Sequence, residues 1–75
     1  MLRISELRQG QLGTVRQVLG TGAVRQRLLD MGMLPSSRVV VERTALTGDP
    51  VWVVLNRTHL ALRRQEADSV LVSEG

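Results

Sequence analysis

Hydrophobic and polar positions follow a helical period in one part of the chain. Val24, Leu28 and Met31 are spaced four and three residues apart, which places three apolar side chains on one helical face. Gly32 follows directly and suits the left-handed residue that ends many helices, and Pro35 prevents the helix from resuming. The pattern predicts one complete helix that ends before Gly32.

The remaining apolar segments have the pattern of short β-strands. Alternating polarity, β-branched residues or short apolar runs between turn residues mark residues 11–19, 38–45, 51–55, 58–62 and 70–72. Asn56-Arg57 separates two of these runs and predicts a hairpin. Single helical turns are expected over residues 64–69 and near the N-terminus, where Ser5 would act as the cap. About five short strands with one inserted helix predict a small, mainly β barrel, whose closure would hide the strand edges.

Composition limits the size and chemistry of the core. The chain of 75 residues has room for one small domain, and its apolar fraction of 43% is almost entirely aliphatic. Trp52 is the only aromatic residue, and its position in the apolar run 51–55 predicts that it is buried. Cysteine is absent, and no apolar run approaches the roughly 18 to 20 residues that cross a bilayer. We therefore expect a cytoplasmic protein without disulfides or membrane insertion.

Arginine alone carries the positive charge. Ten Arg and no Lys stand against seven acidic residues, which gives a net charge of +3 without forming a basic block. This usage fits a solvated surface, and it also fits a surface that binds carboxylates or phosphates, because the guanidinium group is a planar fork. Binding of single-stranded nucleic acid would require several aromatic side chains for stacking, so the single Trp52 makes nucleic acid the less favoured partner.

No residue pattern indicates catalysis, a cofactor or a metal centre. His59 is the only histidine and alternates with Leu60, so we expect an exposed strand position and no metal site. No serine lies in a strand-to-helix elbow. Gly20 and Gly22 precede the helix, but the chain lacks the lysine and the third glycine of phosphate-binding loops. We expect no catalytic residue and no cofactor.

Four segments together resemble the FeoA family over nearly the whole chain. They are Leu7 with Gly10 and Gly13, the string from Val24 to Pro35, Gly48-Asp49-Pro50, and Leu60 to Arg63 followed by Glu66-Ala67 and residues 70–72. The resemblance implies an SH3-like barrel with a structural motif made of Leu28, Met31, Gly32, Pro35, Gly48, Asp49 and Pro50. The chain departs from the family at Ser36, and at Asn56 with Arg57, where the family commonly has glycine.

The resemblance also implies an accessory protein that docks to FeoB, a membrane transporter of ferrous iron with a cytosolic GTPase domain. We expect the contact surface to contain exposed Arg and apolar residues beside the rigid helix end, namely Arg25, Arg27, Met33, Leu34 and Arg63. Met33 and Leu34 could instead cover the mouth of the barrel. The alternative function is a regulatory module similar to the C-terminal domain of iron-dependent repressors, and weak self-association stays open.

Overall fold

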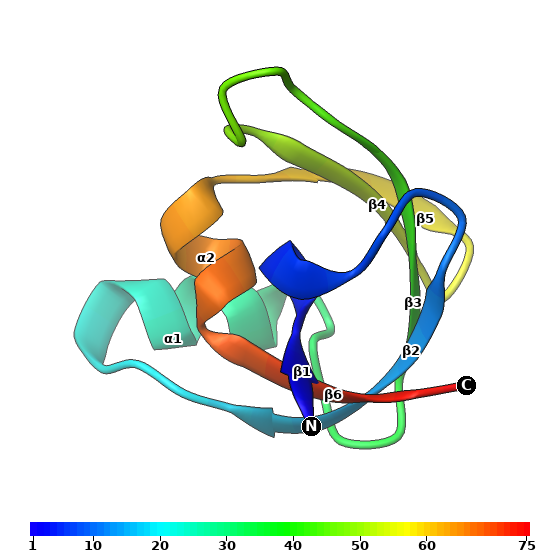
Figure 1. The fold of residues 1–75 in the computed structure, drawn as a ribbon. Helices are drawn as coiled ribbons and strands as arrows, with labels where there is room; N and C mark the ends of the chain where they lie inside the picture. The colour runs from blue at the N-terminus through cyan, green and yellow to red at the C-terminus, as the bar shows by residue number, and fades with distance from the viewer.

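A curled antiparallel sheet of six strands forms the body of the molecule (Figure 1). The computed structural model describes residues 1–75. Along the chain the elements are β1 (Leu2–Arg3), the 3-10 helix η1 (Ile4–Glu6), β2 (Leu12–Val18), α1 (Gly22–Asp30), β3 (Arg38–Thr44), β4 (Val51–Leu55), β5 (Thr58–Leu62), α2 (Arg64–Asp68) and β6 (Val70–Glu74). The strands lie in the order β1-β6-β2-β3-β4-β5. This architecture confirms a mainly β barrel with one inserted helix and short helical turns.

The first strand and the first helical turn differ from the prediction. β1 is a sixth strand of only two residues, which pair with β6 at the other end of the chain, as Leu2 lies opposite Val72. The turn η1 is capped by Arg3 and not by Ser5, because the Glu6 carboxylate accepts a hydrogen bond from the Arg3 backbone N–H at 2.7 Å. In a capping box, a glutamate three residues after the cap residue accepts a hydrogen bond from the backbone N–H of that cap residue.

The helix α1 has the amphipathic face that the sequence predicts. Leu28 is completely buried, and Val24 and Met31 pack against the core from the same face. Gly32 follows the helix with φ of +92°, a left-handed conformation in which glycine has no Cβ penalty. The helix is therefore held by its apolar stripe and ended by a backbone conformation that favours glycine.

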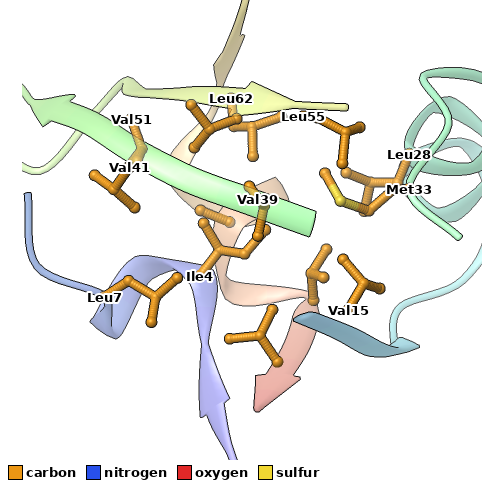
Figure 2. Close-up of a cluster of buried hydrophobic side chains, with 14 residues drawn as sticks. Ile4, Leu7, Val15, Leu28, Met33, Val39, Val41, Val51, Leu55 and Leu62 are labelled. Carbon is orange, nitrogen blue, oxygen red and sulfur yellow. The ribbon is translucent and has the colours of Figure 1, made fainter. Parts of the chain in front are cut away.

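The core is a single cluster of apolar side chains from the strands, the helices and the connections between them (Figure 2). Its fourteen buried residues are Ile4, Leu7, Val15, Leu28, Met33, Val39, Val41, Val51, Val53, Leu55, Leu62, Ala67, Val70 and Val72. Successive residues of a strand point to opposite faces, so β3, β4 and β6 contribute alternate residues to this cluster. Figure 2 shows Leu28 and Met33 next to each other at the end of the cluster beside α1.

Trp52 does not belong to the core, and its predicted burial is wrong. Val51, Val53 and Leu55 of β4 point inward, while Trp52 and Val54 lie half-buried on the outer face. On that face the Arg43 guanidinium stacks on the indole ring, with its carbon atom 3.8 Å from the ring centroid. An unbroken apolar run suits a strand that is covered on both faces, but each strand of a small barrel has only one face toward the core.

Candidate protein-docking surfaces

The two helices lie on the same side of the barrel (Figure 1), and a buried carboxylate joins them. The Glu66 side chain of α2 is only 7% exposed, and its Oε2 atom lies 2.6 Å from the Arg27 Nε atom of α1. Its Oε1 atom accepts a hydrogen bond from the Arg63 backbone N–H at 2.8 Å, so both carboxylate oxygens have partners. Charge-assisted hydrogen bonds of this kind are stronger than neutral ones and fix α1 against the start of α2.

Four of the five predicted docking residues are exposed. Arg25, Arg27 and Arg63 all lie on the surface, and Arg27 and Arg63 come together around Glu66. Leu34 is 51% exposed in the connection that follows α1. Neither Arg25 nor Arg63 takes part in an ion pair, since the three ion pairs of the molecule use other arginines or histidine. These side chains are free to contact another molecule.

Met33 is the exception, and its assignment to an exposed surface is corrected. Its exposed fraction is 0%, and its side chain packs in the core beside Leu28. The chain turns back at Gly32, and the Met33 backbone N–H donates to the Leu28 carbonyl oxygen at 3.0 Å. This return directs the Met33 side chain into the barrel. For Met33 the position agrees with the alternative given above, in which this residue covers the mouth of the barrel.

The Gly48-Asp49-Pro50 motif lies in the connection between β3 and β4 and contacts α2. The Asp49 carboxylate accepts a hydrogen bond from the Arg64 backbone N–H at 3.2 Å. A Cβ atom on Gly48 would lie 2.7 Å from a nitrogen of the Arg64 guanidinium, and its φ is +86°. The guanidinium is the flexible end of the Arg64 side chain and could move aside, so it is the positive φ that favours glycine at this position.

His59 occupies the exposed position on β5 that the sequence predicts. Its Nδ1 atom lies 3.0 Å from the Glu42 Oε1 atom, and the imidazole side chain is 72% exposed. No group of three or more His, Cys, Asp or Glu side chains gathers in a way that could hold a metal ion. Neither helix is long and apolar enough to cross a membrane.

A second surface, which the sequence analysis did not identify, lies on the outer face of β2, β3 and β4. We call it the outer-sheet groove; it has a volume of 570 Å³ and is lined by Leu12, Ser36, Arg38, Val40, Val54, Asn56 and Arg57. Its residues become neighbours only through the pairing of three strands, in which Leu12 lies opposite Val40 and Val40 opposite Val54. The local signals that an outward face is also apolar were the two-sided apolar pattern of residues 11–19 and the unbroken apolar runs 39–41 and 51–55.

Comparison with known proteins gives one family. The model of the FeoA domain family matches residues 2–74. A fusion of Fe(2+) transport protein A with the Fe(2+) transporter FeoB, from Porphyromonas gingivalis, is 32% identical over 71 residues. The aligned region is 95% of this chain but only 8% of the fusion protein, so the chain spans a small part of that relative.

Solved structures of FeoA proteins share the fold. The FeoA protein from Chlorobium tepidum is 37% identical with a TM-score of 0.88, and the match covers 97% of this chain and 70% of that one. FeoA of Stenotrophomonas maltophilia, solved in complex with zinc, is 27% identical with a TM-score of 0.86, over 97% of this chain and 91% of that one. That protein is described as a prokaryotic SH3 domain protein and offered as a ferrous iron transport activating factor. The SH3-like fold expected from the sequence is confirmed.

A protein from outside the FeoA group contains the same fold over part of its length. The IdeR protein of T. acidophilum is 17% identical with a TM-score of 0.87, and the match covers 99% of this chain but 34% of that one. At this identity the likeness shows the fold alone.

Proposed function

Because the chain belongs to the FeoA domain family, which is associated with ferrous iron transport, we propose that it is a non-catalytic accessory protein of a FeoB-type transporter. In this proposal it docks to the cytosolic, GTPase-bearing part of the transporter, at the inner face of the cytoplasmic membrane. The observation that carries the proposal is the fusion of a FeoA domain to FeoB in one relative. Fusion keeps two modules at a high effective concentration, which is useful when the modules bind each other.

We place the docking surface on the side of α1 and α2, with Arg25, Arg27, Leu34 and Arg63 as its contact residues. The Arg27–Glu66 ion pair and the glycine that ends α1 hold this side in a fixed geometry. Arginine and large apolar side chains on a rigid surface are enriched among the residues that dominate binding energy. Because Arg25 and Arg63 have no acidic partner within the chain, an acidic surface on the transporter would complement them.

The proposal is tested by binding of the full chain to a purified FeoB-type transporter from the same organism, measured by biolayer interferometry. We expect Arg25→Glu combined with Arg63→Glu to weaken binding at least about tenfold, because two attractive charge contacts become repulsive. Arg8→Glu combined with Arg16→Glu is the control with the same change in net charge, since both arginines are exposed and lie outside this surface. Absence of binding by the unaltered chain would refute docking, and equal binding by the variant altered at Arg25 and Arg63 would refute this surface.

Two further measurements on the same samples test the other parts of the proposal. GTP hydrolysis by the transporter is measured with and without the chain, and hydrolysis by the isolated chain would contradict a non-catalytic role. Titration of the chain with labelled duplex DNA tests the alternative of a regulatory module like those of iron-dependent repressors. DNA binding that is tighter than transporter binding would favour that alternative.

A further inference from the structure

We propose that the outer-sheet groove binds an extended acidic segment of another protein, with apolar side chains on the groove floor and carboxylates on its arginines. The groove is lined by residues of β2, β3 and β4, by the β4–β5 turn and by Ser36 of the α1–β3 connection, and none of the residues proposed to contact the transporter lines it. The inference therefore does not depend on the proposed function, and its test uses no transporter.

The floor of the groove is aliphatic. Leu12, Val40 and Val54 follow one another across β2, β3 and β4 in the strand pairing, and all three are half-buried on the outer face. The outer face of an antiparallel sheet usually carries polar residues, which tolerate water better. A row of three adjacent aliphatic side chains, each on the next strand about 4.8 Å away, can bury apolar groups of a partner.

The wall of the groove is positively charged and has no acidic neighbour. Arg38 and Arg57 line it, and neither side chain takes part in any ion pair or hydrogen bond of the molecule. No Asp or Glu is among the lining residues. Two uncompensated guanidinium groups beside an apolar floor complement carboxylates, to which arginine can donate two parallel hydrogen bonds.

The rim of this groove is a rigid turn. Three residues other than glycine adopt positive φ, namely Ser36 at +76°, Asn56 at +48° and Arg57 at +71°, and all three line the groove. Asn56 and Arg57 are the two central residues of the β4–β5 hairpin, where a two-residue turn requires positive φ. Asn56 also fixes the rim, because its side-chain amide donates to the Ser37 hydroxyl at 3.3 Å and its side-chain carbonyl oxygen accepts from the Arg38 backbone N–H at 3.4 Å. Arg57 therefore extends from a backbone of fixed geometry at the edge of the groove.

An acidic protein segment suits the groove better than nucleic acid. Phosphates could bind the same two arginines, but single-stranded bases stack on aromatic rings, and the lining residues include none. Trp52 does not line the groove, and one face of its ring is covered by the Arg43 guanidinium. Aliphatic side chains of a polypeptide, in contrast, gain from contact with an aliphatic floor.

The test is an NMR titration of the ¹⁵N-labelled full chain with a synthetic pentapeptide that alternates Glu and Leu and has blocked ends. We expect amide shift changes at Leu12, Val40 and Val54, and a dissociation constant that rises with salt concentration. The same peptide with Gln in place of Glu should bind at least about tenfold more weakly, because a neutral amide cannot form the bidentate ion pair that a carboxylate forms with arginine.

Variants separate binding from folding. Arg57→Gly should weaken peptide binding at least about threefold while raising the melting temperature, because glycine relaxes the backbone at that position. Arg38→Gln together with Arg57→Gly should weaken it at least about tenfold, whereas Arg8→Gln, at an exposed arginine outside the groove and outside the proposed transporter contact, should leave it unchanged. The proposal is overturned by absence of shifts at millimolar peptide, by equal binding of the Gln peptide, or by an equal loss in Arg8→Gln. Tighter binding of oligo-dT than of the Glu peptide at the same amides would overturn it in favour of nucleic acid.

Discussion

Gly32 and Ser36 both adopt left-handed backbone conformations in the connection from α1 to β3. At Gly32 a Cβ atom would meet no atom within 4 Å, so the only cost of a side chain there is conformational. Ser36 already carries a side chain at φ of +76°. The two positions therefore form a natural pair for measuring how much one backbone conformation costs this chain.

Exchanging the side chains at these two positions should shift stability in opposite directions. A left-handed conformation costs a residue with a Cβ about 1–2 kcal/mol, and the extra freedom of glycine in the unfolded chain offsets about 0.5–1 kcal/mol of this. We expect Ser36→Gly to raise the free energy of unfolding by up to about 1 kcal/mol and Gly32→Ala to lower it by a similar amount. Urea denaturation followed by circular dichroism measures both, and a change of the same sign in the two variants would refute the explanation.

At the scale of elements, α2 is a five-residue helix that depends on side-chain links to its neighbours. Glu66 connects it to α1 through Arg27, and Asp68 connects it to η1 through the Ser5 hydroxyl, which donates a hydrogen bond to the Asp68 carboxylate. Isolated helices this short are unstable in water, so their stability comes from tertiary contacts. Removing either link should therefore affect the packing of α2 and the element that it joins.

The Glu66 link should be the stronger of the two, because its carboxylate is buried. Glu66→Ala leaves the Arg63 backbone N–H without its acceptor and Arg27 without its partner, and we expect a loss of about 1–3 kcal/mol in the free energy of unfolding. Glu66→Gln keeps an acceptor oxygen and should cost less. Urea denaturation gives the two losses, and hydrogen exchange should show lower protection across α1 in Glu66→Ala. A stability equal to that of the unaltered chain would show that this link does not hold the helices together.

The Asp68 link should make part of the stability depend on pH. The hydrogen bond from Ser5 holds the pKa of the Asp68 carboxyl below its usual range, and a hydrogen bond from Arg64 acts in the same direction. Because the pKa is lower in the folded state, this contribution is complete above the unfolded pKa of about 3.9 and is lost as pH falls through the folded value. Ser5→Ala should therefore be less stable than the unaltered chain at pH 6, and the difference should shrink below about pH 4. A difference that stays constant from pH 6 to pH 2.5 would refute the link; thermal denaturation at each pH measures it.

At the scale of the whole molecule, the features that the sequence predicted correctly are those with local signals. The stripe of α1 and its final Gly32 lie within one short segment, and Asn56-Arg57 forms the expected turn between β4 and β5. The four segments that resemble the FeoA family likewise led to the correct fold. Patterns of this kind depend on neighbouring residues, so the sequence carries them directly.

Features that depend on distant partners could not be predicted in the same way. β1 is defined by pairing with β6 at the far end of the chain, and two residues carry no period. Met33 is buried because the chain turns back onto Leu28, which the helical period does not describe. The outer-sheet groove requires the pairing of three strands before Arg38 and Arg57 can be placed beside one apolar row. A one-residue shift of that pairing would move each side chain to the other face.

Because α1 and the sheet share one core, the molecule should unfold as a single unit. Leu28 of α1 is completely buried in the same cluster as Val51 and Val53 of β4, while Trp52 between them reports on the sheet from outside. Leu28→Ala should lower the free energy of unfolding by about 2–5 kcal/mol, and Leu28→Met, which nearly conserves volume, by less than about 1.5 kcal/mol.

The same variants test whether that unit is cooperative. Far-UV circular dichroism and Trp52 fluorescence should give the same urea midpoint for the unaltered chain and for Leu28→Met, and both midpoints should fall together in Leu28→Ala. The physical reason is that removal of the Leu28 side chain leaves a cavity against residues of the sheet, so helix and sheet lose stability together. A loss of helical signal at lower urea than the change in Trp52 emission would show that α1 is an independent unit attached to a barrel that is stable without it.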